Sequence, residues 1–411
     1  MPTSPPRSLV VIGLLLMISA VALNPWTVAG LVGVAQFRNP WVLGTIVAGE
    51  IALGVWGYCL PRRPWARTLL FAAIPSLICY FLIECVAVLL IFRQEPDWFR
   101  EQRVQTALFM ADPVIGFKFR PHLRGQEFAW GGGAQRHVVD TDELGFRNVG
   151  HDYSKARVFA IGDSFVFGSG ATREESAVGQ AGTVLGEEVL GLGVPGYEPS
   201  QYEIVLDQLL GRYRPSVVAV CVFVNDIRAP TPPADYAFGQ RTFEKRFEAY
   251  SLRHRTLAFH LLRRYLQRGG ARFQVASNGI TLFERTAVDL DYFRQHHELS
   301  AEALIERLIR KAQQHGVQLV LFTLPSKESA YREDYVRLFG HAQDLEIEEQ
   351  AYQRLLALGK RKGITAVDLT PTFRQAGGHL YFDLDSHWNA AGNALAGKVM
   401  ANTIRDLLPH D

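Results

Sequence analysis

The pattern of hydrophobic and polar positions divides the chain near residue 92. Before this point three long apolar stretches follow one another, and only seven Lys, Arg, Asp or Glu residues occur. After it, short apolar runs alternate with amphipathic stretches. A single compact core would not segregate charge in this way. The pattern therefore predicts a membrane-embedded part followed by a globular part.

The apolar stretches predict three transmembrane helices, at about residues 9–31, 41–60 and 68–92. The second and third are long enough for a hydrocarbon core that needs roughly 20 apolar residues. The first has a second interpretation, because Arg7 and the small residues Ala20-Val21-Ala22 are also typical of a cleavable secretory signal. We favour an uncleaved anchor, since the apolar character continues beyond that site.

The distribution of arginines predicts the orientation of these helices. Arg62, Arg63 and Arg67 lie between the second and third helices, whereas the first connection carries only Arg38. Because cytoplasmic loops are enriched in Lys and Arg, the loop with three arginines is expected inside the cell. The chain after the third helix then lies outside the cytoplasm. This predicts a multi-pass inner-membrane protein with its large domain on the periplasmic or extracellular side.

Two acidic residues interrupt the predicted membrane helices. Glu50 and Glu84 fall at nearly equal depth, roughly 12–14 Å inside the outer boundary at a rise of about 1.5 Å per residue. Carboxyl groups at this depth are costly, so they often mark a shared proton or a polar contact with a membrane partner. Two neutral, hydrogen-bonded side chains that hold the helices together are the alternative.

The globular part alternates strands with helices from residue 157 onward. The predicted strands are 157–161, 188–192, 216–224, 317–324 and 364–369, and the predicted helices are 201–212, 301–315, 350–362 and 390–407. Such alternation is typical of βαβ units with right-handed crossovers. We therefore predict an α/β domain built on a doubly wound parallel sheet.

Two segments do not fit this alternation. Residues 93–156 are rich in Gly and Arg and contain short β-like pieces, which predicts a small β-rich extension that links the membrane part to the sheet. Residues 229–299 begin with Ala229-Pro230-Thr231-Pro232-Pro233, which cannot continue a strand or a helix. They predict a lid-like insertion. The expected organisation is 1–92, 93–156 and 157–411.

Candidate catalytic residues stand at the predicted strand ends, where open α/β sheets bind ligands. Ser164 follows the first strand in Gly162-Asp163-Ser164, Gly196 follows the second, and Asn225 follows the third. His387 precedes the last helix, close to two carboxylates. A serine nucleophile needs a base, a group that orients the base, and donors for the oxyanion. The sequence offers each of these parts.

Taken together, these ordered blocks resemble the SGNH/GDSL hydrolase family over residues 157–411. The resemblance implies a flavodoxin-like sheet, with Ser164 as nucleophile and first oxyanion donor. It implies Gly196 and Asn225 as the other two donors and His387 as the base. The family's usual orienting Asp lies three residues before the His, where this chain has Leu384. Asp385 is therefore the preferred candidate, with Asp383 as the alternative.

Two further departures concern the second and third blocks. Gly191 stands where the family usually has an Asn that braces the loop, and Phe223 stands where it usually has Gly. The Asp385-Ser386-His387-Trp388 spelling resembles the branch that includes alginate O-acetyltransferases. It points to a carbohydrate of the cell envelope as the substrate.

Composition adds little to this interpretation. The net charge of +2 does not favour nucleic acid, and the four cysteines form no C-x-x-C spacing. No metal or cofactor is expected. The predicted function is an extracytoplasmic serine esterase or O-acyltransferase acting on acyl, preferentially acetyl, esters of envelope carbohydrate. The alternatives are a catalytically silent glycan-binding or assembly subunit, and a lipid or general esterase.

Overall fold

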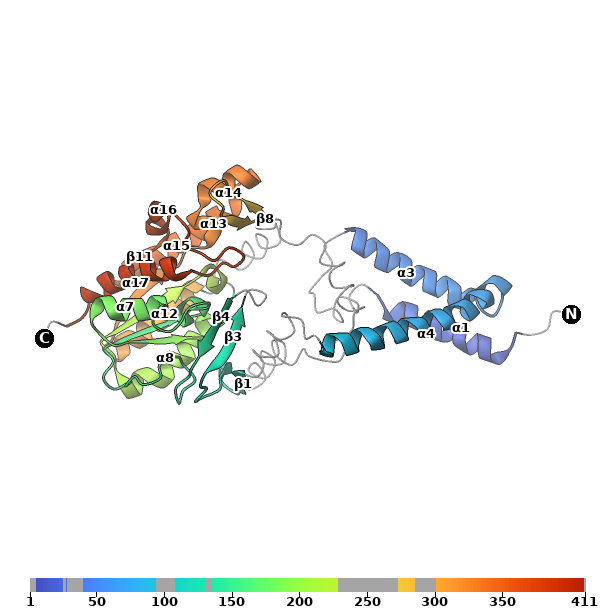
Figure 1. Ribbon diagram of the computed structural model, residues 1–411, viewed down its shortest axis with the longest axis horizontal. Helices are drawn as coiled ribbons and strands as arrows, with labels where there is room; N and C mark the ends of the chain where they lie inside the picture. The colour runs from blue at the N-terminus through green and yellow to red at the C-terminus, as the bar shows by residue number, and fades with distance from the viewer. Residues whose placement is uncertain are drawn as a thin grey trace. The chain divides into compact units, whose positions relative to one another are not determined.

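The computed structural model describes residues 5–24, 27, 40–93, 108–130, 135–227, 273–284 and 301–409. They fall into two compact units: one contains the N-terminal helices, and the other contains the described residues from 108 onward (Figure 1). The predicted lid at 229–299 lies outside the described residues apart from 273–284. Most of the predicted first connection also lies outside them.

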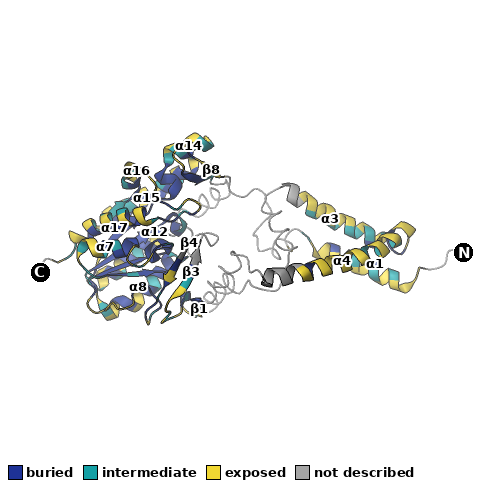
Figure 2. Cartoon of the chain, viewed as in Figure 1, coloured by how far each residue is buried: buried dark blue, intermediate teal, exposed yellow. Residues whose placement is uncertain are grey.

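Three apolar helices make up the described part of the first unit: α1 (Arg7–Ala22), α3 (Pro40–Cys59) and α4 (Pro64–Arg93). Within the described residues, the stretch Pro64–Val86 is long and apolar enough to cross a membrane, whereas the apolar stretches in α1 and α3 are shorter. The helices expose large apolar side chains to their surroundings, including Phe71 at 73% and Val21 at 72%. Figure 2 shows much of α1, α3 and α4 in the colour of exposed residues. Contiguous exposure of this kind is typical of a surface that meets lipid or another protein.

Helices α1 and α3 pack closely against each other at two glycines. A Cβ atom on Gly13 would lie 2.5 Å from the carbonyl oxygen of Gly57, and one on Gly57 would lie 2.6 Å from that of Gly13. Small residues allow helix backbones to approach in this way. On α4, the carboxylate of Glu84 is buried and accepts a hydrogen bond of 3.1 Å from the Tyr80 hydroxyl one turn earlier, while Glu50 is half-buried on α3.

A five-stranded parallel sheet forms the centre of the second unit. In chain order its strands are β5 (Val158–Gly162), β6 (Val189–Gly193), β7 (Val217–Val222), β10 (Gln318–Thr323) and β11 (Thr365–Asp368). Across the sheet they lie in the order β11-β10-β7-β5-β6, and every neighbouring pair is parallel. Counted along the chain, this is the 2-1-3-4-5 order of flavodoxin-like folds. The predicted α/β class with a parallel sheet is confirmed.

The long helices pack against the sheet in two groups. Helix α7 (Ala177–Leu185) packs on α17 (Ala390–Arg405), whereas α12 (Ala301–Gln314) packs between α8 (Pro199–Tyr213) and α15 (Gln343–Lys362). Their inner faces bury Leu, Ile and Val side chains against the strands. Shorter elements follow the strand ends: α6 (Ser164–Phe167), η1 (Val224–Ile227), α13 (Lys327–Ala330), α14 (Arg332–Phe339) and α16 (Thr370–Ala376).

The described part of the β-rich extension consists of two hairpins: β1 (Phe109–Asp112) with β2 (Gly116–Phe119), and β3 (Gln126–Trp130) with β4 (Gln135–Val139). A third hairpin, β8 (Phe273–Val275) with β9 (Thr281–Phe283), lies in the predicted insertion. The extension shares its core with the sheet domain, because Phe119 and Phe128 lie 5.1 and 5.6 Å from the Phe167 ring. It therefore packs directly behind the segment that carries Ser164.

Candidate active site

Ser164 is the first residue of α6, and only Asp163 separates it from the buried strand β5. The Asp163 side chain caps this helix by accepting a hydrogen bond of 3.0 Å from the backbone N–H of Phe165. Strand order reverses between β5 and β7, and ligands of doubly wound sheets bind at the carboxyl end of such a switch point. Ser164 follows β5 and Asn225 follows β7, so both lie at this point.

A continuous chain of hydrogen bonds joins Ser164, His387 and Asp385. Nε2 of His387 lies 2.7 Å from Oγ of Ser164, and Nδ1 lies 2.5 Å from Oδ1 of Asp385. The same carboxylate oxygen accepts the backbone N–H of His387 at 2.7 Å. With the Nδ1 proton held by Asp385, Nε2 is free to accept the proton of the serine hydroxyl. All three side chains are at least nine-tenths buried.

The two residues that precede Asp385 in the same loop are exposed, whereas Asp385 is buried. The Asp383 side chain is 74% exposed and lies 4.0 Å from His379, and Leu384 is 64% exposed. Neither faces the imidazole in the way that Asp385 does. Burial acts to raise the pKa of Asp385, but the hydrogen bonds and charge of His387 outweigh it and hold this pKa below its usual value. Asp385 is thus the carboxylate that the geometry pairs with the histidine.

Asn225 is tied to the serine turn through Asp163. Its Nδ2 donates a hydrogen bond of 3.0 Å to Oδ2 of Asp163, which leaves its second amide proton for another acceptor. Burial raises the pKa of Asp163, against the opposing effect of these hydrogen bonds. The next residue, Asp226, closes the Asn225 turn by accepting the Phe223 N–H at 2.8 Å and the Tyr202 hydroxyl at 3.0 Å.

Gly196 lies in a tight turn after β6, the strand that pairs with β5. The Tyr197 N–H donates to the carbonyl of Val194 at 3.0 Å, and Gly196 has a φ of +82° after Pro195. This is the type II arrangement, in which the third residue is normally glycine. At Gly193, which starts the same loop, a Cβ atom would lie 2.4 Å from the Phe167 nitrogen. The loop 193–197 therefore lies directly against the segment 163–167, which carries Ser164.

The extension braces this site through two side chains that no motif in the sequence indicates. Arg147 donates to the carbonyl of Phe167 at 2.8 Å and to that of Ala171 at 3.0 Å, and its guanidinium lies 4.7 Å from the Phe167 ring. Burial lowers the pKa of Arg147 to about 10. The carbonyl of Phe167, the last residue of α6, is thus satisfied by a side chain of the extension.

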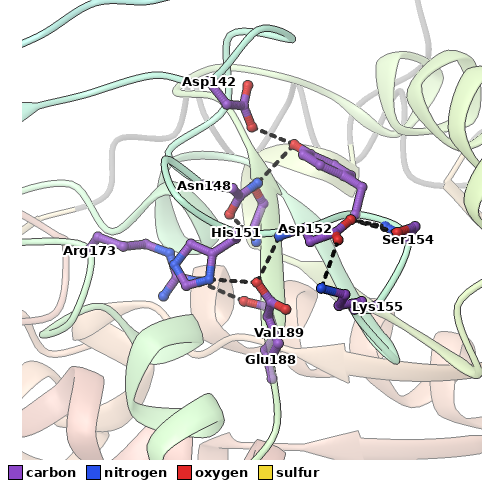
Figure 3. Close-up of polar contacts among 11 residues, drawn as sticks. Asp142, Asn148, His151, Asp152, Ser154, Lys155, Arg173, Glu188 and Val189 are labelled. Carbon is purple, nitrogen blue, oxygen red and sulfur yellow. Dashed lines mark hydrogen bonds and ion pairs between the residues drawn. The ribbon is translucent and has the colours of Figure 1, made fainter.

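Asn148 provides the second brace. Its Oδ1 accepts a hydrogen bond from the Gly191 N–H, and its Nδ2 donates one to the Gly191 carbonyl, both at 3.0 Å. The same Nδ2 donates to the Tyr153 hydroxyl, and that hydroxyl donates to Asp142. Figure 3 shows Asn148 and Asp142 in this network. The family's bracing Asn is replaced by Gly191, and an amide from the extension contacts that glycine. The sequence indicated this region only as part of a β-rich extension and gave no signal for Asn148 itself.

Aromatic rings pack behind the histidine. The Phe165 ring lies 4.9 Å from the His387 imidazole, 4.7 Å from Trp388 and 4.4 Å from Phe223. Phe223, in the position where the family usually has glycine, is therefore part of this support. Among the residues that the structure describes, no cluster of three or more His, Cys, Asp or Glu side chains could hold a metal ion.

Residues 282–411 match the family described as "SGNH hydrolase-like domain, acetyltransferase AlgX". The matched range includes Asp385 and His387 but not Ser164. Similar curated proteins are named "Probable alginate O-acetylase AlgJ". The one from Azotobacter vinelandii is 32% identical over 26% of this chain and 27% of its own length, and the one from Pseudomonas aeruginosa is 30% identical over 25% and 26%. The chain thus covers only about a quarter of the length of these relatives.

Among solved structures, an acetyl xylan esterase has 16% sequence identity and a TM-score of 0.35, and the match covers 60% of this chain and 98% of that chain. Residues 282–411 thus match an SGNH hydrolase-like domain, and about a quarter of the chain is similar to proteins named as probable alginate O-acetylases.

Proposed function

We propose that this protein is an extracytoplasmic serine esterase or O-acyltransferase that acts on acetyl esters of envelope carbohydrate. The observation that carries the proposal is the hydrogen-bonded series Ser164, His387 and Asp385. A catalytically silent glycan-binding subunit would have no need to keep a buried serine, imidazole and carboxylate aligned in this order. Nucleophilic catalysis depends on that alignment.

The proposed reaction proceeds through an acyl-enzyme. His387 takes the proton of Ser164 while Oγ attacks the ester carbonyl carbon, and Asp385 stabilises the imidazolium that forms. The oxyanion is held by the backbone N–H groups of Ser164 and Gly196 and by Nδ2 of Asn225. Collapse of the intermediate expels the alcohol, which takes the proton from His387. Water or a sugar hydroxyl then attacks the acyl-enzyme with His387 again as the base, and Ser164 is regenerated.

The choice of substrate is supported by the relatives rather than by the geometry. The matched C-terminal family is described as an acetyltransferase, and the curated relatives are named as alginate O-acetylases. This favours an acetyl group and a polysaccharide acceptor over a lipid ester. The proposed reaction needs no cofactor, because the serine, histidine and carboxylate supply the nucleophile and the base.

Acetyl turnover with and without an acceptor tests this function. We expect the purified full-length chain to release acetate from an aryl acetate and to form a covalent adduct with a fluorophosphonate at Ser164. Adding a uronic acid oligosaccharide is expected to divert acetyl groups to its hydroxyls, which mass spectrometry detects as an added 42 Da, the mass that one acetyl group contributes in place of hydrogen. Absence of a serine adduct on folded protein would support the silent subunit, and faster cleavage of long-chain esters would support the lipid esterase.

We further propose that the protein is anchored in the cytoplasmic membrane by three helices, with the catalytic unit outside. One long apolar helix, the exposed apolar side chains and the packing of α1 on α3 at Gly13 and Gly57 support this. The close packing of α1 also favours its retention over cleavage.

Terminal tags on the full-length chain test this placement. We expect a C-terminal tag to be digested by protease added to spheroplasts, and an N-terminal tag to be retained and protected. Loss of the N-terminal tag during export would contradict an uncleaved anchor, and a protected C-terminal tag would contradict the orientation. We also propose that Glu50 and Glu84 contact each other or a membrane partner. Joint substitution of both by Gln that left expression and activity unchanged would remove this proposal.

A further inference from the structure

Lys327 is a lysine that the structure buries almost completely, at 1% exposure, beside the proposed site. It begins helix α13 at the carboxyl end of β10, directly after the helix cap Ser326. Lysine is seldom buried unless its ammonium is paired. The partners of this group therefore indicate what holds it there.

The Lys327 ammonium donates hydrogen bonds to two backbone carbonyls, those of Phe382 at 2.7 Å and Asp383 at 2.8 Å. These carbonyls lie just before Asp385 and His387 in the chain. The same loop is closed on itself by the Phe382 N–H, which donates to the His387 carbonyl at 3.1 Å. Lys327 thus contacts the start of the short loop 382–387, which carries both His387 and its orienting carboxylate. We call this segment the histidine loop.

The turn that presents Lys327 is itself held from two sides. The N–H and hydroxyl of Ser326 donate to the Glu348 carboxylate on α15, at 3.1 and 2.8 Å. The Tyr381 hydroxyl donates to the carbonyl of Pro325 at 2.8 Å. Because these contacts join the turn to α15 and to Tyr381, and the turn itself follows β10, the ammonium has a defined position relative to the sheet.

Charge at this position acts on Asp385 as well as on the loop. Burial lowers the pKa of Lys327, while the carboxylates of Glu328, Asp383 and Asp385 oppose that effect. Reciprocally, the ammonium adds to the influences of His387 that lower the pKa of Asp385. A positive charge here therefore favours the ionised Asp385 that an imidazolium requires.

We propose that Lys327 is a positioning residue for this site: its ammonium holds the loop at Phe382 and Asp383 and so fixes the imidazole of His387 against Ser164. The inference rests on the function proposed above. Ser164 comes from the other side of the sheet's switch point, so the distance from Nε2 to Oγ depends on where this loop is anchored. A displacement of about 1 Å at such a contact can cost on the order of 100-fold in rate.

Substitution of Lys327 in the full-length protein tests the proposal, with acetate release from an aryl acetate as the readout. Lys327→Met keeps most of the side-chain volume but removes the donor and the charge. We expect kcat to fall by about 100-fold, while KM changes little, because the contact orients the catalytic groups and does not bind substrate. Lys327→Arg keeps the charge and the donors, and we expect it to recover a large part of kcat.

Lys362→Met is the matched control, since the Lys362 ammonium forms a surface ion pair with Glu306 at 2.6 Å, far from the histidine loop in the chain. We expect it to keep the wild-type kcat. Thermal unfolding of each variant checks the fold, and Lys327→Arg serves as the informative variant if Lys327→Met does not fold.

Three outcomes would overturn the inference. The first is a Lys327→Met protein with wild-type kcat. The second is a loss confined to KM. The third is an equal loss in the Met and Arg variants together with lost thermal stability, which would indicate a structural role only. Failure of the proposed function itself is distinguishable, because the wild-type protein would then form no fluorophosphonate adduct at Ser164.

Discussion

Replacing Ser164 by alanine is expected to lower the turnover of an acetyl ester by about 10⁶-fold, the size of the loss when the nucleophile of a serine protease is removed. Oγ of Ser164 is the only atom of the site that bonds covalently to the acyl group in the proposed reaction. Alanine leaves the oxyanion donors in place, so binding of the ester is expected to survive. Initial rates of acetate release, measured on protein free of contaminating esterase, provide the test.

Two comparisons make this result specific. Asn225→Ala removes one oxyanion donor and is expected to cost about 100- to 1000-fold, well short of the loss at the nucleophile. Ser169→Ala is the control, because Ser169 is also buried and its hydroxyl has no hydrogen-bond partner among the described residues. It is expected to keep full activity. Equal losses at Ser164 and Ser169 would point to disruption of the fold and not of the chemistry.

Replacing Asp385 by asparagine is expected to lower kcat by about 10⁴-fold, as the same change does in the serine proteases. The asparagine amide would donate to Nδ1 of His387 instead of accepting its proton. The imidazole would then carry its proton on Nε2, where it cannot accept the hydrogen of the Ser164 hydroxyl. Ester turnover together with the rate of fluorophosphonate labelling measures this loss at the nucleophile.

Asp383→Asn is the matched comparison for this change. Its carboxylate is 74% exposed and lies against His379, so its neutralisation is expected to leave most of the activity. The opposite result, with Asp383→Asn inactive and Asp385→Asn active, would contradict the role of Asp385 and would show that Asp383 orients His387. The pair of variants therefore decides between the two carboxylates that the sequence leaves open.

Most of the sheet could be predicted because its strands are buried on both faces. β7 is a continuous apolar run rich in valine, and β10 is apolar from Leu319 to Phe322. Such runs are typical of central parallel strands. The longer helices were predictable from their periodicity, although α15 begins at Gln343 and not near residue 350. Polar residues in its first turns hid the start.

Helix α7 escaped prediction for a physical reason. Its sequence contains Gly179 and Gly182, which lower the intrinsic propensity for a helix. The glycines are needed because a Cβ atom on Gly179 would lie 2.2 Å from the carbonyl of Arg173. Packing against α17 then supplies stability that the local sequence lacks. Tertiary contacts override propensity at such positions.

The candidate residues Ser164, Gly196, Asn225 and His387 could be chosen from the sequence, because chemistry-bearing residues at strand ends converge on one edge of a parallel sheet. The division of the chain into an apolar and a globular part could also be predicted, because it follows from the local pattern of charged and apolar residues. Contacts between distant segments could not be predicted in this way. One example is the contact of Lys327 with the histidine loop. The others are the contacts of Arg147 with Phe167 and of Asn148 with Gly191. Each depends on which loops the fold brings together. The tertiary structure also placed Asp385 rather than Asp383 against His387, because side-chain direction in an irregular loop is determined by packing and hydrogen bonding that no local pattern encodes.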